Sequence, residues 1–113
     1  MRSITINGRR IGPCAPVYII AELSANHHQS FQKAVELVRA AHEAGADAVK
    51  LQTYTPDTLT IPCDKEYFRV GQGSLWTGRN LYELYGEAYT PWEWQPRLQE
   101  IAAELGLAPI LFT

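Results

Sequence analysis

Three short apolar segments, separated by stretches of helical periodicity, constrain the fold of this chain more than any other feature. They occupy residues 17–21, 46–52 and 108–113. The first is a nearly continuous apolar run, which is typical of a parallel strand covered on both faces. A helix is predicted after it, with Ser30 as the N-cap, because apolar residues recur at helical spacing. The residues of this apolar face are Phe31, Ala34, Val35, Val38, Ala41 and His42.

A long connection runs from residue 53 to about residue 89. It is too long for a plain loop in a compact domain, so it is expected to carry structure and function. Asn80 predicts the start of a short helix within it. A stronger helix start follows, with Thr90 as the N-cap, Pro91 in the first helical position and Glu93 closing a capping box. The buried stripe of that helix is predicted at Trp94, Leu98, Ile101, Ala102 and Leu105.

An N-terminal β-hairpin is predicted before the alternating segments. The dipeptide Asn7-Gly8 suits the two positive φ angles of a type I′ turn. The sequence therefore predicts an α/β chain, with a hairpin in residues 1–16 and a βαβαβ portion of a parallel barrel in residues 17–113. Three strands cannot close a barrel and the last would be an open apolar edge, so we expect the chain to be incomplete.

Composition excludes several kinds of partner. The formal net charge is −2, so no basic face is expected to bind nucleic acid. No apolar run reaches the roughly 20 residues that span a bilayer, and the N-terminus lacks the apolar stretch of a secretion signal. A cytoplasmic location is expected. Cys14 and Cys63 fit no zinc or redox spacing, and are expected to be reduced thiols.

Polar residues stand where the first two strands end, which is where parallel α/β folds bind ligands. Glu22 ends the first strand, and Lys50 and Gln52 share one face of the second. An unpaired ammonium inside a barrel costs several kcal/mol, so Lys50 needs a partner. That partner is either Glu22, in a structural ion pair, or a bound carboxylate or phosphate. The position at the strand ends favours the binding site.

The first loop and the long connection supply further candidates. Adjacent histidines such as His27 and His28 can ligate a metal, but no third ligand stands at a matching spacing. Contact of Asn26 and His27 with substrate hydroxyls or phosphate is therefore favoured. For Tyr54, ligand contact and packing both stay open. Aromatic residues, which suit sugar surfaces, are frequent in the connection: Tyr54, Tyr67, Phe68, Trp76, Tyr82, Tyr85 and Tyr89.

Several motifs resemble the sialic acid synthase family, and the resemblance covers nearly the whole chain. They are AELSANH at residues 21–27, AGADAVKLQT at 44–53 and YTPWEW at 89–94. Residues 52–58 and 81–94 are similar to one branch of that family in particular. The family commonly has Asn-His-Asn-Gly where this chain has Asn-His-His-Gln at residues 26–29, which removes an easy positive-φ position.

The resemblance implies a TIM (β/α)8 barrel, followed by a small antifreeze-like domain, in a homodimer. It implies condensation of phosphoenolpyruvate with 2,4-diacetamido-2,4,6-trideoxy-altrose to a nonulosonic acid, with phosphate released. It also implies a divalent metal cation (Mn, Mg or Co type), held by histidines on later strands. Matching positions imply that Glu22 is catalytic and orients or deprotonates a water. They imply substrate-binding roles for Lys50, Gln52, Asn26, His27 and, near the phosphate, Thr113.

Other functions remain open on the sequence alone. Sister enzymes make N-acetylneuraminate or legionaminate. A related class condenses phosphoenolpyruvate with sugar phosphates and needs basic residues for the sugar phosphate, but the loop motifs of this chain do not resemble those of that class. A non-enzymatic alternative is an inactive half-barrel that binds a ligand or self-associates through its open strand. Without the later histidines, these residues alone are expected to be inactive.

Overall fold

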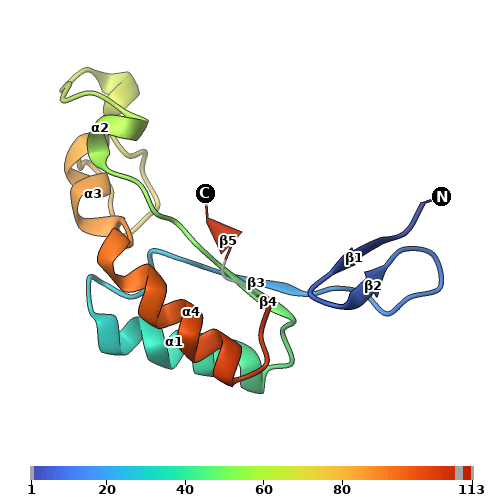
Figure 1. Ribbon diagram of the computed structural model, residues 1–113. Coiled ribbons are helices and arrows are strands. Elements are labelled where there is room, and N and C mark those ends of the chain that lie inside the picture. The colour runs from blue at the N-terminus through green and yellow to red at the C-terminus, as the bar shows by residue number, and fades with distance from the viewer. Residues whose placement is uncertain (1, 109–110, 113) are drawn as a thin grey trace.

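The computed structural model describes residues 2–108 and 111–112, and contains a hairpin, a parallel sheet and a helical layer (Figure 1). The hairpin consists of β1 (Ile4–Ile6) and β2 (Arg9–Ile11). The sheet has the order β3 (Ile20–Ser24), β4 (Ala48–Leu51), β5 (Leu111–Phe112), all parallel. Helix α1 (Phe31–Glu43) joins β3 to β4. Between β4 and β5 lie α2 (Pro56–Leu59), the 3₁₀ turn η1 (Glu66–Phe68), α3 (Leu81–Ala88), the 3₁₀ turn η2 (Trp92–Trp94) and α4 (Gln95–Glu104).

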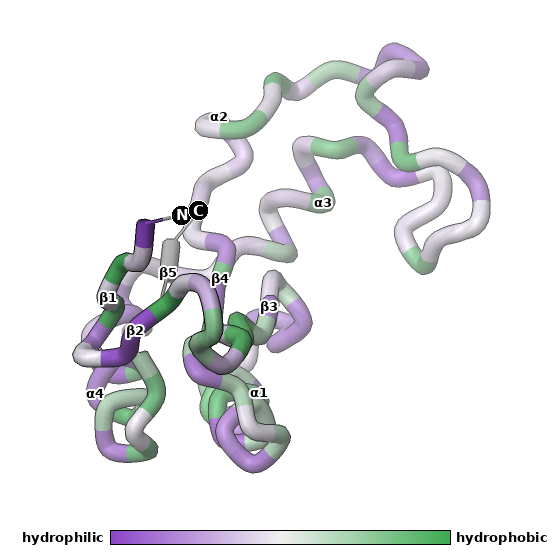
Figure 2. Tube along the Cα trace, turned by 90° about the vertical axis from the view of Figure 1, so that its right-hand side faces the viewer, coloured by the Kyte–Doolittle hydropathy of each residue, from purple (hydrophilic) through white to green (hydrophobic). Residues whose placement is uncertain are grey.

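Helices α1 and α4 lie side by side on the same face of the sheet (Figures 1 and 2). Consecutive strands with both crossover helices on one face form the arrangement of a barrel wall, whereas doubly wound folds place helices on both faces. The α/β prediction is confirmed. The described residues form an open sheet, so barrel closure stays a prediction.

The hydrophobic core lies between the sheet and the two helices. It is made of apolar side chains from all of these elements, including Val38 from α1, Val49 and Leu51 from β4, and Leu98 and Ala102 from α4. All five are fully buried. Burial of this kind supplies about 25 cal/mol per Å² of apolar surface, which makes the core the main stabilising contribution.

The predicted hairpin is present. Asn7 and Gly8 have φ angles of 49° and 78°, as a type I′ turn requires. The hairpin is anchored to the sheet by Arg9, whose guanidinium forms an ion pair with Asp47. Asp47 also accepts a hydrogen bond from the Ile19 N–H at 2.7 Å, so one carboxylate connects the hairpin to the entry of the sheet.

The first sheet strand begins later than predicted. β3 starts at Ile20, where it pairs with Ala48, the first residue of β4. Val17 and Ile19 precede it and are 79% and 52% exposed. The prediction that both faces of this segment are covered is therefore wrong for the described residues. Apolarity predicted a strand here, but ladder pairing decides where a strand starts.

Helix α1 follows its prediction closely. The Ser30 hydroxyl accepts a hydrogen bond from the Lys33 N–H at 3.3 Å, as an N-cap does. The predicted apolar face is buried at Ala34, Val35, Val38 and Ala41, whereas His42 is exposed.

The start of the last helix differs from its prediction. Thr90 does not cap it, because η2 comes first and α4 begins only at Gln95. Pro91 has an extended ψ of 137°, so it is not a helical residue. The Thr90 N–H instead donates to the Gln52 carbonyl at 2.9 Å, at the end of β4. The predicted stripe is nevertheless correct farther along, where Leu98, Ile101 and Ala102 are buried.

The long connection extends from the carboxyl end of β4 and rises away from the sheet (Figure 1). Asn80 caps α3 as predicted, its side-chain oxygen accepting from the Tyr82 N–H at 2.8 Å. Among residues 2–108 and 111–112, no helix combines the length and apolarity that crossing a membrane requires.

Candidate functional site

Glu22 and Lys50 form the charged centre of the strand ends. They are register partners on β3 and β4, and the Lys50 Nζ lies 2.8 Å from the Glu22 Oε2. Val49 and Leu51 are fully buried on the helix side, so Lys50 lies on the opposite, open face of the sheet, as the alternation predicted. The Lys50 and Glu22 side chains are 30% and 46% exposed. A solvated pair of this kind contributes at most about 1 kcal/mol, so an incoming anion can compete for the ammonium.

A cavity of about 220 Å³ opens beside this pair. Three predicted site residues, Asn26, Gln52 and Tyr54, line it together. The rest of its lining is Ser24, Ala25, Trp76, Leu84, Tyr85 and Ala88. The strand ends and the long connection therefore build one concave surface, although their residues lie far apart in the sequence.

Tyr54 takes part in both packing and the lining of the cavity. Its ring lies edge-on to Tyr85, with 5.4 Å between centroids. Burial raises the pKa of the Tyr54 hydroxyl, and the neighbouring Tyr85 raises that pKa further. The hydroxyl therefore stays protonated near neutral pH and can donate a hydrogen bond, but it is not poised to act as a base.

His27 is an interior residue. It is fully buried, its Nε2 lies 2.9 Å from the Thr90 hydroxyl, and its Nδ1 accepts from the Gln29 N–H at 3.2 Å. A backbone N–H can only donate, so Nδ1 carries no proton and Nε2 donates to Thr90. Burial lowers the pKa of His27, and nearby His28 lowers that pKa further, in agreement with a neutral ring. This geometry argues against the predicted direct contact with substrate and gives His27 a structural role.

The first loop keeps a tight conformation without glycine. His28 and Gln29, which stand in place of the family's Asn-Gly pair, have left-handed φ angles of 48° and 58°. Such angles cost a non-glycine residue of the order of 1 kcal/mol and persist only when surroundings enforce them. The Gln29 side-chain amide donates to the Tyr89 carbonyl at 2.5 Å, and the Gln29 N–H is held by His27.

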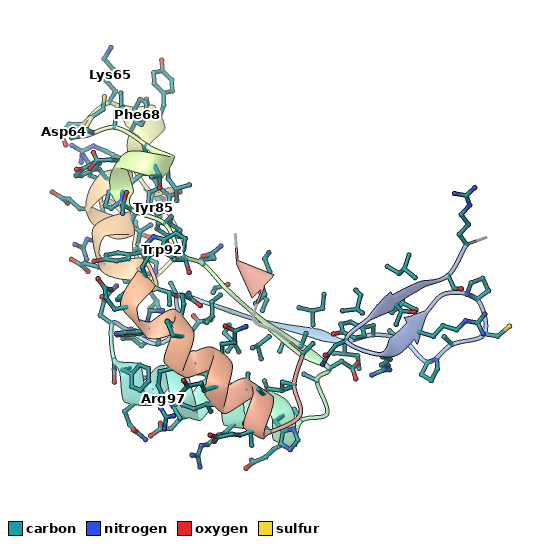
Figure 3. The ribbon with its side chains drawn as sticks, viewed as in Figure 1. Asp64, Lys65, Phe68, Tyr85, Trp92 and Arg97 are labelled. Atoms are coloured by element: carbon teal, nitrogen blue, oxygen red, sulfur yellow. The ribbon has the colours of Figure 1, made fainter. Side chains whose placement is uncertain are left out.

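Several residues of this region had no functional prediction. Thr90 resembled a helix cap but binds His27, and buried Gln95 donates to the Thr53 hydroxyl at 2.5 Å. Trp76 was among the aromatic residues that suit sugar surfaces, but no sequence signal placed it beside the strand ends. Figure 3 shows Tyr85 and Trp92 near the junction of α3 and α4, whereas Asp64, Lys65 and Phe68 lie at the far tip.

Two sequence predictions concern positions outside the described residues. Thr113 lies outside the described residues. The metal ligands are predicted on later strands, and within residues 2–108 and 111–112 no three His, Cys, Asp or Glu side chains come together as a metal site.

The fold and the geometry define a parallel α/β protein whose candidate site lies at the carboxyl ends of its strands. The chain belongs to the NeuB family, whose model matches residues 37–111, and the resemblance to sialic acid synthases is thereby confirmed. It is 54% identical over 91 residues to the pseudaminic acid synthase of Campylobacter jejuni, covering 80% of this chain and 26% of that protein. It is 51% identical over 92 residues to the pseudaminic acid synthase of Helicobacter pylori, covering 81% of this chain and 27% of that protein.

A solved structure has the same fold. The spore coat polysaccharide biosynthesis protein SpsE of Bacillus subtilis superposes with a TM-score of 0.68 at 31% identity, over 98% of this chain and 27% of that one. The chain thus spans about a quarter of the length of the proteins it matches.

Proposed function

We propose that the protein containing this chain is a pseudaminic acid synthase, a transferase that condenses phosphoenolpyruvate with 2,4-diacetamido-2,4,6-trideoxy-altrose to give pseudaminic acid and phosphate. The observation that carries the proposal is the Lys50–Glu22 pair beside a cavity lined by Asn26 and Gln52. The Lys50 ammonium suits a small anion, and the carboxamides of Asn26 and Gln52 suit a polar sugar. The similarity to pseudaminic acid synthases over most of this chain supports the choice of acceptor.

The Lys50 ammonium would bind the carboxylate or the phosphate of phosphoenolpyruvate. Its ammonium stands on the open face of the sheet, and its present partner is only a solvated carboxylate. A fixed positive charge of this kind offsets negative charge on the three-carbon substrate as bonds rearrange.

Glu22 would act on the water that adds to the phosphate-bearing carbon. When Lys50 binds the anion, the Glu22 carboxylate is released to accept a hydrogen bond from water and to orient it or take its proton. The Ser24 hydroxyl lies 3.4 Å from the other Glu22 oxygen, a contact that helps to fix the carboxylate. Carbon–carbon bond formation precedes this step, and collapse of the adduct expels phosphate.

The acceptor sugar would occupy the adjacent cavity. Asn26 and Gln52 offer carboxamide donors and acceptors to hydroxyl and acetamido groups, and the protonated Tyr54 hydroxyl offers a donor. Thr113 would lie near the phosphate if the third strand continues in the family's manner.

The remaining parts of the proposal concern the whole protein. We expect a closed TIM barrel, a C-terminal antifreeze-like domain, a homodimer and a cytoplasmic location. A divalent cation is expected on histidines of later strands.

The test is phosphate release by the full-length protein with phosphoenolpyruvate and the diacetamido sugar. Lys50→Ala should lower kcat/KM by at least 100-fold, a loss typical of a removed electrostatic contact. Lys33→Ala, which removes an exposed lysine of α1, is the matched control. Turnover of N-acetylmannosamine or the legionaminate precursor instead would identify a sister synthase. Absence of turnover with every sugar would overturn the synthase proposal, and normal activity of Lys50→Ala would remove the proposed role of Lys50.

A further inference from the structure

The cavity at the strand ends has two chemically different sides. The carboxamides of Asn26 and Gln52 come from the first loop and the end of β4. The apolar part of the lining comes from the long connection and includes Trp76, Leu84 and Ala88. A cavity with amides on one side and apolar groups on the other fits a small ligand group that is itself polar at one end and apolar at the other.

The apolar side is held in place by contacts outside the cavity. The Arg79 guanidinium lies 5.7 Å from the centroid of the Trp76 ring, a cation–π contact. Glu87 fixes that guanidinium with two hydrogen bonds, at 2.8 and 2.5 Å. Tyr85, from the same helix as Leu84 and Ala88, packs edge-on against Tyr54. These side chains are therefore already ordered before a ligand binds, which lowers the entropic cost of binding.

We propose that this cavity binds an acetamido group of the acceptor sugar, and that Leu84 and Ala88 set the size of its acyl chain. The proposal rests on the proposed function. An acetamido group has one N–H and one carbonyl, which pair with the carboxamides of Asn26 and Gln52. Its methyl group would then contact Leu84, Ala88 and the Trp76 ring, where a hydroxyl would lose its hydrogen bonds.

The experiment compares two sugars that differ by one methylene in the full-length protein. The wild type should use the natural diacetamido sugar at least roughly 10-fold better, by kcat/KM, than the analogue carrying one propanamido group, since one methylene in a hydrophobic pocket changes kcat/KM by that much. Leu84→Ala makes room for the extra methylene, so the kcat/KM values of this variant for the two sugars should differ by no more than about threefold. Leu75→Ala is the matched control, because Leu75 belongs to the same connection but is 99% exposed.

A second variant tests the same apolar lining in the opposite direction. Ala88→Leu narrows the cavity, so the KM for the diacetamido sugar should rise at least roughly 10-fold while the KM for phosphoenolpyruvate stays constant. Circular dichroism and thermal unfolding verify that each variant is folded.

The outcomes separate this inference from the proposed function. Wild-type turnover of the diacetamido sugar, with Leu84→Ala and Ala88→Leu both behaving like Leu75→Ala, would overturn the acetamido subsite and leave the synthase proposal standing. Equal changes in KM for both substrates would also overturn it, because they indicate a general disturbance of the site. A wild type that does not turn over the diacetamido sugar would overturn the proposed function itself.

Discussion

Replacing His27 by Ala should loosen the connection between the first loop and the end of β4. The substitution removes the hydrogen bonds of the ring with Thr90 and Gln29, each contributing about 1 kcal/mol. It also removes the edge-on contact with Trp94, at 5.1 Å between centroids, which adds about 1 kcal/mol. The sum is about 3 kcal/mol, before the cavity left by a fully buried side chain is considered.

Hydrogen exchange at individual amides is the appropriate assay, because it reports local opening within a large protein. The Gln29 N–H donates to the His27 ring and the Thr90 N–H donates to the Gln52 carbonyl. With about 3 kcal/mol lost, exchange at these amides should become roughly 100-fold faster, since 1.4 kcal/mol corresponds to a factor of ten. The control is His28→Asn, because His28 is exposed and asparagine tolerates its left-handed φ.

A double-mutant cycle with Thr90→Val isolates the contact between the two side chains. His27 and Thr90 should show a coupling energy of about 1 kcal/mol, the contribution of one buried hydrogen bond. Additive effects of the two substitutions, or exchange in His27→Ala no faster than in His28→Asn, would refute the structural role of His27.

Two further predictions concern stability. The pKa of His27 is lowered below 6.5 in the folded protein, so the unfolded chain binds the proton more readily. The contribution of neutral His27 to the free energy of unfolding is therefore fully present above pH 6.5. It decreases as the pH falls from 6.5 toward the lowered pKa of the folded state. Thermal unfolding at about pH 7.5 and about pH 5.5 should show a smaller decrease in His27→Ala than in the wild type, and an equal decrease would contradict the assignment. Leu98→Ala, in the core between α4 and α1, should lower the free energy of unfolding in urea by about 2–5 kcal/mol. Leu75→Ala, the exposed control, should change it by less than about 0.5 kcal/mol. Similar effects of the two substitutions would disprove this account of the core.

Local patterns predicted the features that depend on residues near each other in the chain. Apolar spacing and Ser30 predicted α1, and alternation in β4 placed Lys50 opposite Val49 and Leu51. The Asn7-Gly8 dipeptide predicted the hairpin turn. These succeed because helix and strand periodicities, caps and tight turns arise from backbone geometry over a few residues.

Other local patterns were misleading where a distant residue competed for the same group. Thr90 has the sequence context of a helix cap, yet its hydroxyl binds His27. The apolar run at residues 17–21 predicted a strand, but β4 offers ladder partners only from Ala48 onward. A capping or pairing prediction considers one segment, whereas the folded chain satisfies each polar group with whichever partner is nearest in space.

By itself, the sequence determined the alternation of strands and helices, the hairpin, and the face of β4 on which Lys50 lies. Only the tertiary structure decided that His27 binds a residue 63 positions away, and that Trp76 and Leu84 complete the cavity of Gln52 and Asn26. The reason is physical. Periodicity records which face of an element is apolar, whereas the partners across a cavity are selected by how the elements pack once that face is buried.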